Sequence, residues 1–390
     1  MIFNKYRLED ITDKIGDGIH GTPEYDDNGD FYFVNGNNLV YGDIAFKNDT
    51  KRINEEQYLK NKRNLNKNTL LVSINGTLGN VAKYNNEKII LGKSACYINV
   101  KDEYNVDYVY FVFESPKFKK YLQYGANGTT IKNVPLSAIR NYEISIPSKE
   151  NQDKIVKILK SIEDKIKLNN KINNNLHDLC NNLYFKLVSQ LNDTNSSVES
   201  IKNVAKCVLG GTPSRTKKEY WNGSINWINS GEINKFRIIK ASEKITELGL
   251  NKSSTTLLPR GTTVLAITGA TLGQVSRLEI DSCANQSVIG IITNKKELNN
   301  YMYLSILNSI NDLVLKQTGG AQQHINKNDV ETHEIIVPST ELISQFDEII
   351  RPLFDQISVN CFEINKLEQL RDTLLPKLMN GEIDLDNIEI

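Results

Sequence analysis

Three polar, glycine-containing loops occur in each half of the sequence, and their side chains are of types that contact DNA. They cover residues 16–25, 75–79 and 124–132, and again 210–221, 268–273 and 317–327. Arginine and lysine reach phosphates or guanine, asparagine and glutamine pair with adenine, and the threonine methyl suits thymine. Glycine lets the backbone approach a phosphate. The candidate contacts are His20, Thr22, Asn75, Thr77, Asn127, Thr129, Lys132, Thr212, Ser214, Arg215, Lys217, Lys218, Thr268, Thr271, Gln322, Gln323, His324 and Lys327.

The whole set of loops carries more weight than any single residue in it. Threonine, asparagine and glycine are also common in ordinary turns, so each position alone has a purely structural explanation. The framework of the loops repeats between the two halves, whereas the polar residues differ. One scaffold that reads two different targets requires this combination.

Residue types for catalysis or metal binding do not occur at the necessary spacing. Residues 16–21 match the dinucleotide pattern G-x-G-x-x-G, but the acidic segment that follows begins Thr-Pro and does not suggest the required helix. The four histidines are scattered, and HExxH, GxSxG, a Walker loop and the Asn/Asp-Pro-Pro-aromatic tetrad of amino-methyltransferases are absent from the sequence. The five cysteines form no CxxC, which predicts reduced structural thiols. We expect no catalytic residue, metal or cofactor site in this chain.

Length and charge indicate the number of domains and the class of partner. The chain has 390 residues, which at about 150 residues per domain predicts two to three domains. Lys and Arg number 47 and balance 47 Asp and Glu, whereas nucleic-acid-binding domains are usually basic overall. A nucleic-acid binder of this composition would need its positive charge segregated on one face or supplied by a partner. No stretch approaches the length of an apolar membrane span, and the first ten residues lack the basic and apolar regions of a signal peptide. We therefore expect a cytoplasmic protein.

An internal repeat determines the predicted architecture. Shifting the sequence by about 190 to 194 positions realigns several blocks. Residues 69–81, 21–23 and 144–147 fall on residues 263–275, 211–213 and 335–338. The chain is therefore predicted to be one unit written twice.

A heptad seam follows each copy. Its apolar positions are Ile155, Leu159, Ile162, Ile166, Leu176, Leu183 and Leu187, and then, 191 residues later, Phe346, Ile350, Leu353, Ile357, Leu367, Leu374 and Leu378. This spacing predicts two helices of about 35 residues, each about 50 Å long. Asn169 and Asn360 fall at the same seam position, and we expect them to fix the register where the helices meet.

Charge favours pairing of these helices with each other. Residues 154–187 carry seven Lys against three acids, and residues 341–378 carry seven acids against four Lys or Arg. The alternative is two amphipathic helices that pack separately on two domains. Pro352 is expected to bend the second helix, and Pro376 to fray it.

The remaining segments predict mixed α+β domains. Short β-rich runs occur at 30–34, 69–74, 88–91 and 142–146, short helices are expected at 108–113 and 301–307, and 191–197 resembles a linker. We expect two globular mixed α/β domains, 1–148 and 194–340. Two long helices, 149–193 and 341–390, join them as an antiparallel coiled coil with a pseudo-twofold repeat.

The sequence resembles the specificity (S) subunits of type I restriction-modification systems over essentially its whole length. The resemblance rests on residues 211–215, 219–228, 261–273, 284–287, 325–338 and, most specifically, 370–383. The first half departs more, since residues 16–27 keep Gly-Thr-Pro but are acidic and no Trp follows.

The resemblance implies a non-catalytic chain with two target recognition domains. Two modification subunits, which bind S-adenosylmethionine and methylate adenine, would pack on the helices. Two restriction subunits would supply ATP-driven translocation and cleavage. We expect each domain to read one half of a bipartite, asymmetric site in double-stranded DNA, with the helices as the ruler between them. The alternatives are a self-contained modification or restriction enzyme, and a scaffold or carbohydrate-binding protein that does not bind DNA.

Overall fold

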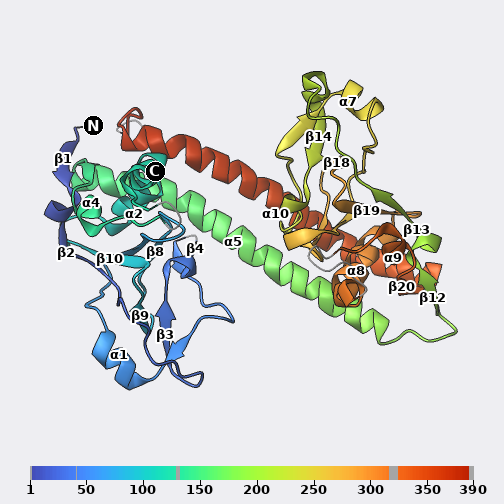
Figure 1. Ribbon diagram of the computed structural model, residues 1–390, viewed down its shortest axis with the longest axis horizontal. Coiled ribbons are helices and arrows are strands. Elements are labelled where there is room, and N and C mark those ends of the chain that lie inside the picture. The colour runs from blue at the N-terminus through green and yellow to red at the C-terminus, as the bar shows by residue number, and fades with distance from the viewer. Residues whose placement is uncertain (1, 41, 129–131, 316–323, 386–390) are drawn as a thin grey trace. The chain divides into compact units, whose positions relative to one another are not determined.

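The computed structural model describes residues 2–40, 42–128, 132–315 and 324–385, and these form two compact units. One unit consists of residues 1–165 with 367–390, and the other of residues 166–366. Each unit contains a globular domain together with parts of two long helices, α5 (Lys149–Val188) and α10 (Thr340–Met379) (Figure 1).

The first unit is built on a four-stranded antiparallel sheet in the order β2-β10-β7-β8. Its strands are Thr12–Asp17, Ala95–Val100, Thr69–Ser73 and Val81–Lys83. A three-stranded sheet follows the order β6-β3-β9, with bounds Arg52–Ile53, Phe31–Val34 and Ile89–Leu91. Two strand pairs complete it: β1 (Asn4–Arg7) with β11 (Glu143–Ile146), and β4 (Leu39–Val40) with β5 (Asp43–Ile44). The shorter helices are α1 (Glu55–Asn61), α2 (Val106–Glu114), α3 (Pro116–Gly125) and α4 (Leu136–Arg140).

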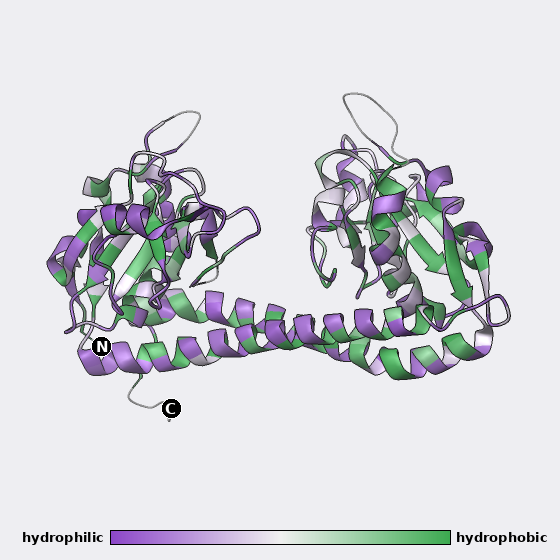
Figure 2. Cartoon of the chain, turned by 90° about the horizontal axis from the view of Figure 1, so that it is seen from below, coloured by the Kyte–Doolittle hydropathy of each residue, from purple (hydrophilic) through white to green (hydrophobic). Residues whose placement is uncertain are grey.

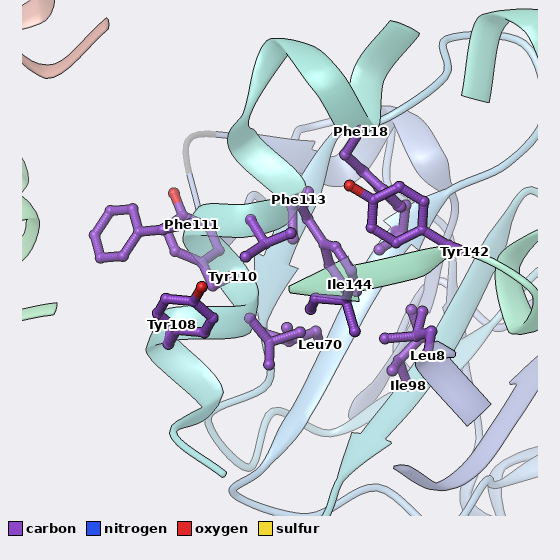
Figure 3. Close-up of a cluster of buried hydrophobic side chains, with 14 of the residues drawn as sticks. Leu8, Leu70, Ile98, Tyr108, Tyr110, Phe111, Phe113, Phe118, Tyr142 and Ile144 are labelled. Atoms are coloured by element: carbon purple, nitrogen blue, oxygen red, sulfur yellow. The ribbon is translucent and has the colours of Figure 1, made fainter. Parts of the chain in front are cut away.

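Helix α2 forms the centre of the core in this unit. Asn105 caps its N-terminus by accepting the backbone N–H groups of Asp107 and Tyr108, and residues 108–113 are then buried without interruption. Figure 3 shows these side chains beside those of the sheet and of Tyr142. Ile155 of α5 and Leu378 of α10 belong to the same cluster, so the domain and the two helix ends share one core.

The second unit repeats this arrangement. Its four-stranded antiparallel sheet follows the order β13-β19-β16-β17, with bounds Ala205–Leu209, Val288–Thr293, Thr263–Ala266 and Val275–Arg277. The three-stranded sheet follows β15-β14-β18, with bounds Glu243–Ile245, Trp221–Ile228 and Cys283–Ala284, and β12 (Ser196–Ser200) pairs with β20 (Glu334–Pro338). Its helices are α6 (Ile201–Val204), α7 (Glu247–Asn251), α8 (Leu298–Leu315) and α9 (Lys327–Glu331).

Strand order confirms the predicted repeat and the α+β class. Both four-stranded sheets place their strands in the same sequence-relative order, and each three-stranded sheet contains one parallel pair, β3 with β9 and β14 with β18. The four predicted strand runs correspond to β3, β7, β9 and β11, and the two predicted short helices lie within α2 and α8. The predicted linker at 191–197 is shorter than expected, because β12 already begins at Ser196. Division of the chain at 148, 193 and 340 stays a prediction.

Both long helices have 40 residues, more than the 35 or so that the seam predicts, and they end before the predicted limits of 193 and 390. Figure 2 shows apolar residues recurring along them, as a seam requires. Ile155, Leu159, Phe346 and Ile350 of the predicted seam are buried. The prediction of fraying at Pro376 is wrong, because α10 continues to Met379.

Within the second unit, α5 and α10 pack against each other in opposite directions. Asn169 Nδ2 donates to Glu363 Oε2 at 2.7 Å, and Asn360 Nδ2 donates to Asn173 Oδ1 at 2.9 Å. Residue numbers thus rise along one helix as they fall along the other, which contradicts the alternative of two separate helices. Asn169 and Asn360, which we expect to fix the register, are both buried where the helices meet. Each asparagine pairs with a residue about one turn from the other, as an antiparallel register requires.

Candidate nucleic-acid interface

The predicted loops of the first unit come together around one turn, residues 92–94. Gly18 N–H donates to Ala95 C=O at 3.2 Å, and Ile19 N–H donates to Leu91 C=O at 2.7 Å, which fixes the first loop. Ile74 N–H donates to Ser94 C=O at 2.9 Å, which fixes the second. The exposed Lys93 at this turn was missed by the sequence reasoning.

The second and third loops of this unit are joined directly. Gly76 N–H donates to Lys132 C=O at 3.1 Å, and Val134 N–H donates to Ile74 C=O at 2.8 Å. Asn127 and Asn133 exchange two backbone hydrogen bonds of 2.8 Å, which close the base of the third loop. We call the segments 16–22, 74–79, 92–94, 127–128 and 132–133 loop cluster 1.

Loop cluster 2 of the second unit comprises residues 210–216, 267–273, 285–287 and 324–327. Ile267 links two of its segments, since its N–H donates to Ser287 C=O and its C=O accepts from Ile325 N–H, both at 3.0 Å. Thr212 Oγ1 donates to Gln286 Oε1 at 2.6 Å, which ties in the first loop. The same backbone positions make the links in both clusters, so the fold presents two equivalent sets of polar loops.

Arg215 is the most elaborately held side chain of loop cluster 2. Both of its terminal nitrogens contact the carboxylate of Glu243, with Nη2 to Oε1 at 3.0 Å. Its guanidinium carbon lies 3.7 Å from the ring centroid of Trp221 and 5.0 Å from that of Trp227. The hydrogen bond from Arg215 lowers the pKa of Glu243 below its ordinary value. The Arg215 side chain nevertheless remains 53% exposed.

A family model for the type I restriction modification DNA specificity domain matches the chain twice, at residues 3–178 and 194–370. The chain belongs to this family. Two copies of the domain together span most of the sequence, and each copy covers the globular domain of one unit and most of the long helix that follows it.

Type I specificity subunits are also found among individual relatives. The type I restriction enzyme MjaIX specificity subunit of Methanocaldococcus jannaschii is 23% identical over 343 residues, which cover 83% of this chain and 79% of that protein. The HindI specificity subunit of Haemophilus influenzae is 22% identical over 346 residues, with 69% and 75% covered. The crystal structure of an S subunit from M. genitalium has a TM-score of 0.60 at 18% identity, covering 97% and 96% of the two chains. At this identity the structural likeness shows a shared fold.

In this member of the specificity-subunit family, most of the predicted contact residues of the described segments are exposed. These are His20, Thr22, Thr77, Asn127, Lys132, Ser214, Arg215, Lys217, Lys218, His324 and Lys327. Asn75, Thr212, Thr268 and Thr271 are half-buried. Thr129, Gln322 and Gln323 lie outside the described residues. The role of all of them in DNA contact stays a prediction.

Several of these side chains already have partners within the specificity subunit. His20 Nε2 lies 2.8 Å from Asp17 Oδ2, Lys217 Nζ donates to the Tyr220 hydroxyl at 3.1 Å, and Lys327 Nζ lies 3.2 Å from Glu331 Oε1. Exposed pairs of this kind contribute little to stability.

The described part of the chain contains no cluster of three His, Cys, Asp or Glu residues able to hold a metal ion. Among the same residues, no helix is both long and apolar enough to cross a membrane. All five cysteines are free thiols, and burial raises the pKa of Cys96 and Cys207 to about 12.

Proposed function

We propose that this chain is the non-catalytic DNA-reading subunit of a type I restriction-modification complex, and that each of its domains reads one half of a bipartite, asymmetric site. The observation that carries the proposal is the pair of equivalent loop clusters with different side chains. Lys93 occupies the position of Gln286, and Asn75 that of Thr268, because their neighbours make the same backbone hydrogen bonds. Different donors and acceptors on one framework specify different base pairs.

Helices α5 and α10 serve in this proposal as the ruler between the two half-sites. Two readers on one face of DNA favour half-sites about one helical turn apart, centre to centre. The target then consists of two short specified blocks that flank several unspecified base pairs.

The same helices provide the docking surface for two modification subunits. Leu168 and Leu179 of α5 are 51% and 44% exposed, and the residues 191 positions later, Val359 and Leu370, are 59% and 46% exposed. Exposed apolar residues that recur at equivalent positions in both repeats suit two copies of one partner.

Chemistry resides in the partners under this proposal. The modification subunits bind S-adenosylmethionine and methylate adenine, and two restriction subunits, where present, bind ATP and Mg²⁺. The chain itself holds no cofactor. We place the complex in the cytoplasm, where it meets double-stranded DNA.

A domain exchange tests the proposal. Residues 1–148 are replaced by the corresponding domain of another specificity subunit, and the complex with its modification subunits methylates a randomised duplex library. We expect one half of the target to change and the other half and the spacing to stay. The reciprocal exchange of residues 194–340 is the matched control and changes the other half. A change in both halves after either exchange contradicts two independent readers.

A further inference from the structure

Both units place an exposed, planar side chain at the same position, two residues after the Pro of Gly-Thr-Pro. In the first unit it is Tyr25, whose ring centroid lies 6.1 Å from that of Phe33 on β3. In the second unit it is Arg215, which lies over Trp227 on β14. Tyr25 is 46% exposed and the Arg215 side chain 53%. The fold therefore presents a different chemical group on the same aromatic support.

A third residue completes each arrangement: Lys51, which directly precedes β6, and Glu243, the first residue of β15. Phe33 N–H donates to Lys51 C=O at 2.9 Å, and Trp227 pairs with Glu243 in the register of β14 and β15. Lys51 Nζ lies 5.8 Å from the Tyr25 ring, whereas Glu243 binds Arg215 through two contacts. The group that is presented and the residue that braces it have thus changed together between the repeats.

Arg215 keeps the donors that it needs for a base. A guanidinium has five N–H donors, and a bidentate carboxylate uses two of them. The indole of Trp221 covers one face of the group, and Trp221 Nε1 itself donates to Ser214 C=O at 3.1 Å. A side chain held on two sides loses little freedom when it binds, which favours affinity and geometric precision.

We propose that Arg215 reads a guanine in the half-site bound by residues 194–340, and that Glu243 is a positioning residue that orients its guanidinium without touching DNA. Bidentate contact with O6 and N7 of guanine is the commonest specific arginine contact in the major groove. The inference rests on the proposed function, because it requires this domain to read base pairs. In this proposal the carboxylate of Glu243 contributes to base specificity although it is not a basic residue.

The experiment uses the full chain in complex with its modification subunits and a library of duplexes randomised within the target. Arg215→Ala, Glu243→Ala, Glu243→Gln and the double variant Arg215→Ala/Glu243→Ala are compared with wild type. Glu247→Ala, which removes an exposed carboxylate from nearby α7, is the matched control. The two tryptophans of the chain, Trp221 and Trp227, both adjoin Arg215, so their fluorescence reports local folding in each variant.

We expect Arg215→Ala and Glu243→Ala to relax the same single G·C position, each by about tenfold or more, and the double variant to relax it no further. Glu243→Gln keeps the shape but removes the charge, and relaxes that position to a smaller extent. The control retains the wild-type preference.

Three results overturn the inference. Arg215→Ala could lower methylation equally on all sequences, Arg215→Ala and Glu243→Ala could relax two different base positions, or the wild-type half-site could contain no guanine. If Arg215→Ala weakens DNA binding equally on all sequences, and the slope of log affinity against log salt falls by about one, then Arg215 contacts a phosphate instead. A wild-type complex that selects no sequence contradicts the proposed function itself, which separates the two failures.

Discussion

Asn360 donates a hydrogen bond of 2.9 Å to Asn173 in the buried seam between α5 and α10. Gln356 donates to the Oδ1 atom of Asn360 at 2.7 Å, so both ends of this amide have partners. A hydrogen-bonded polar layer inside an apolar seam makes the protein less stable than leucine would at the same positions. It fixes the register of the helices, because sliding one helix along the other would break these hydrogen bonds.

A single substitution in this layer should destabilise the protein more than the double substitution does. Asn360→Leu leaves the buried Oδ1 of Asn173 without its donor, although Asn173 Nδ2 still donates to Cys361 Sγ at 3.5 Å. We expect a loss of about 1–3 kcal/mol in unfolding free energy. Asn173→Leu/Asn360→Leu removes both polar groups and recovers most of the loss. Chemical denaturation followed by circular dichroism measures both, with the exposed Asn170→Leu as control. A double variant less stable than either single one would contradict a paired layer.

Glu279 lies fully buried between arginines where the second domain meets α10. Its Oε1 contacts Arg277, and lies 3.6 Å from Nε of Arg237, whose side chain is also fully buried. The guanidinium of Arg237 packs on Tyr303 of α8 and Phe354 of α10, at 4.6 and 5.2 Å from the ring centroids. The cluster therefore joins the domain to the helix.

Removal of this carboxylate should be strongly destabilising. Glu279→Ala leaves buried guanidinium groups without their counter-charge, and we expect a loss of about 3–5 kcal/mol. Glu143→Gln breaks the exposed pair with Lys5 and should unfold close to wild type, since water screens that pair. Thermal denaturation compares the melting temperatures of both variants with that of wild type. Equal melting of Glu279→Ala and wild type would show that the carboxylate does not hold the arginines.

His177 on α5 should make stability depend on pH. Burial, and secondly the charge of Arg237, lower the pKa of His177 below its ordinary value of 6.5. The unfolded chain then takes up a proton at a higher pH than the folded chain, so this contribution is present above pH 6.5 and is lost as pH falls below it. His177→Gln should give a flatter dependence of the denaturation midpoint between about pH 7.5 and 5.5. Parallel curves for variant and wild type would contradict this origin.

Exposed apolar residues on the long helices should control assembly. We expect Leu168→Asp/Val359→Asp to weaken binding of modification subunits about tenfold or more, because it places two charges where apolar surface becomes buried. Val198→Asp, at a 65% exposed position on β12, is the control and should bind normally. Isothermal titration with purified modification subunits provides the measurement. Normal binding by the double variant would place the docking surface elsewhere.

The sequence predicts the repeat and the long helices because both depend on regular spacing. Ile155 and Leu159 recur at heptad positions and are buried as expected. Asn173 was overlooked, although it lies four residues after Asn169 and continues the same seam. Its pairing with Asn360 depends on the antiparallel register of two helices distant in sequence, which spacing alone does not determine.

The candidate site was only partly predictable. The glycine and polar residues of the sequence predicted where the loops lie. Lys93 and Gln286 were not predicted, because each lies in a short turn that only backbone hydrogen bonds of the fold connect to the loops. Glu243 was overlooked because a carboxylate does not suggest DNA contact. Its partner Arg215 lies 28 residues earlier, and only the pairing of β14 with β15 brings the two together.

The methylation motif of the source genome tests the central claim most directly. Methylated adenines are mapped by sequencing in cells with this gene and in cells from which it has been deleted. Two equivalent readers predict one asymmetric motif of two short specified blocks separated by several unspecified base pairs, which disappears with the gene. A single continuous motif that depends on this gene would contradict the account.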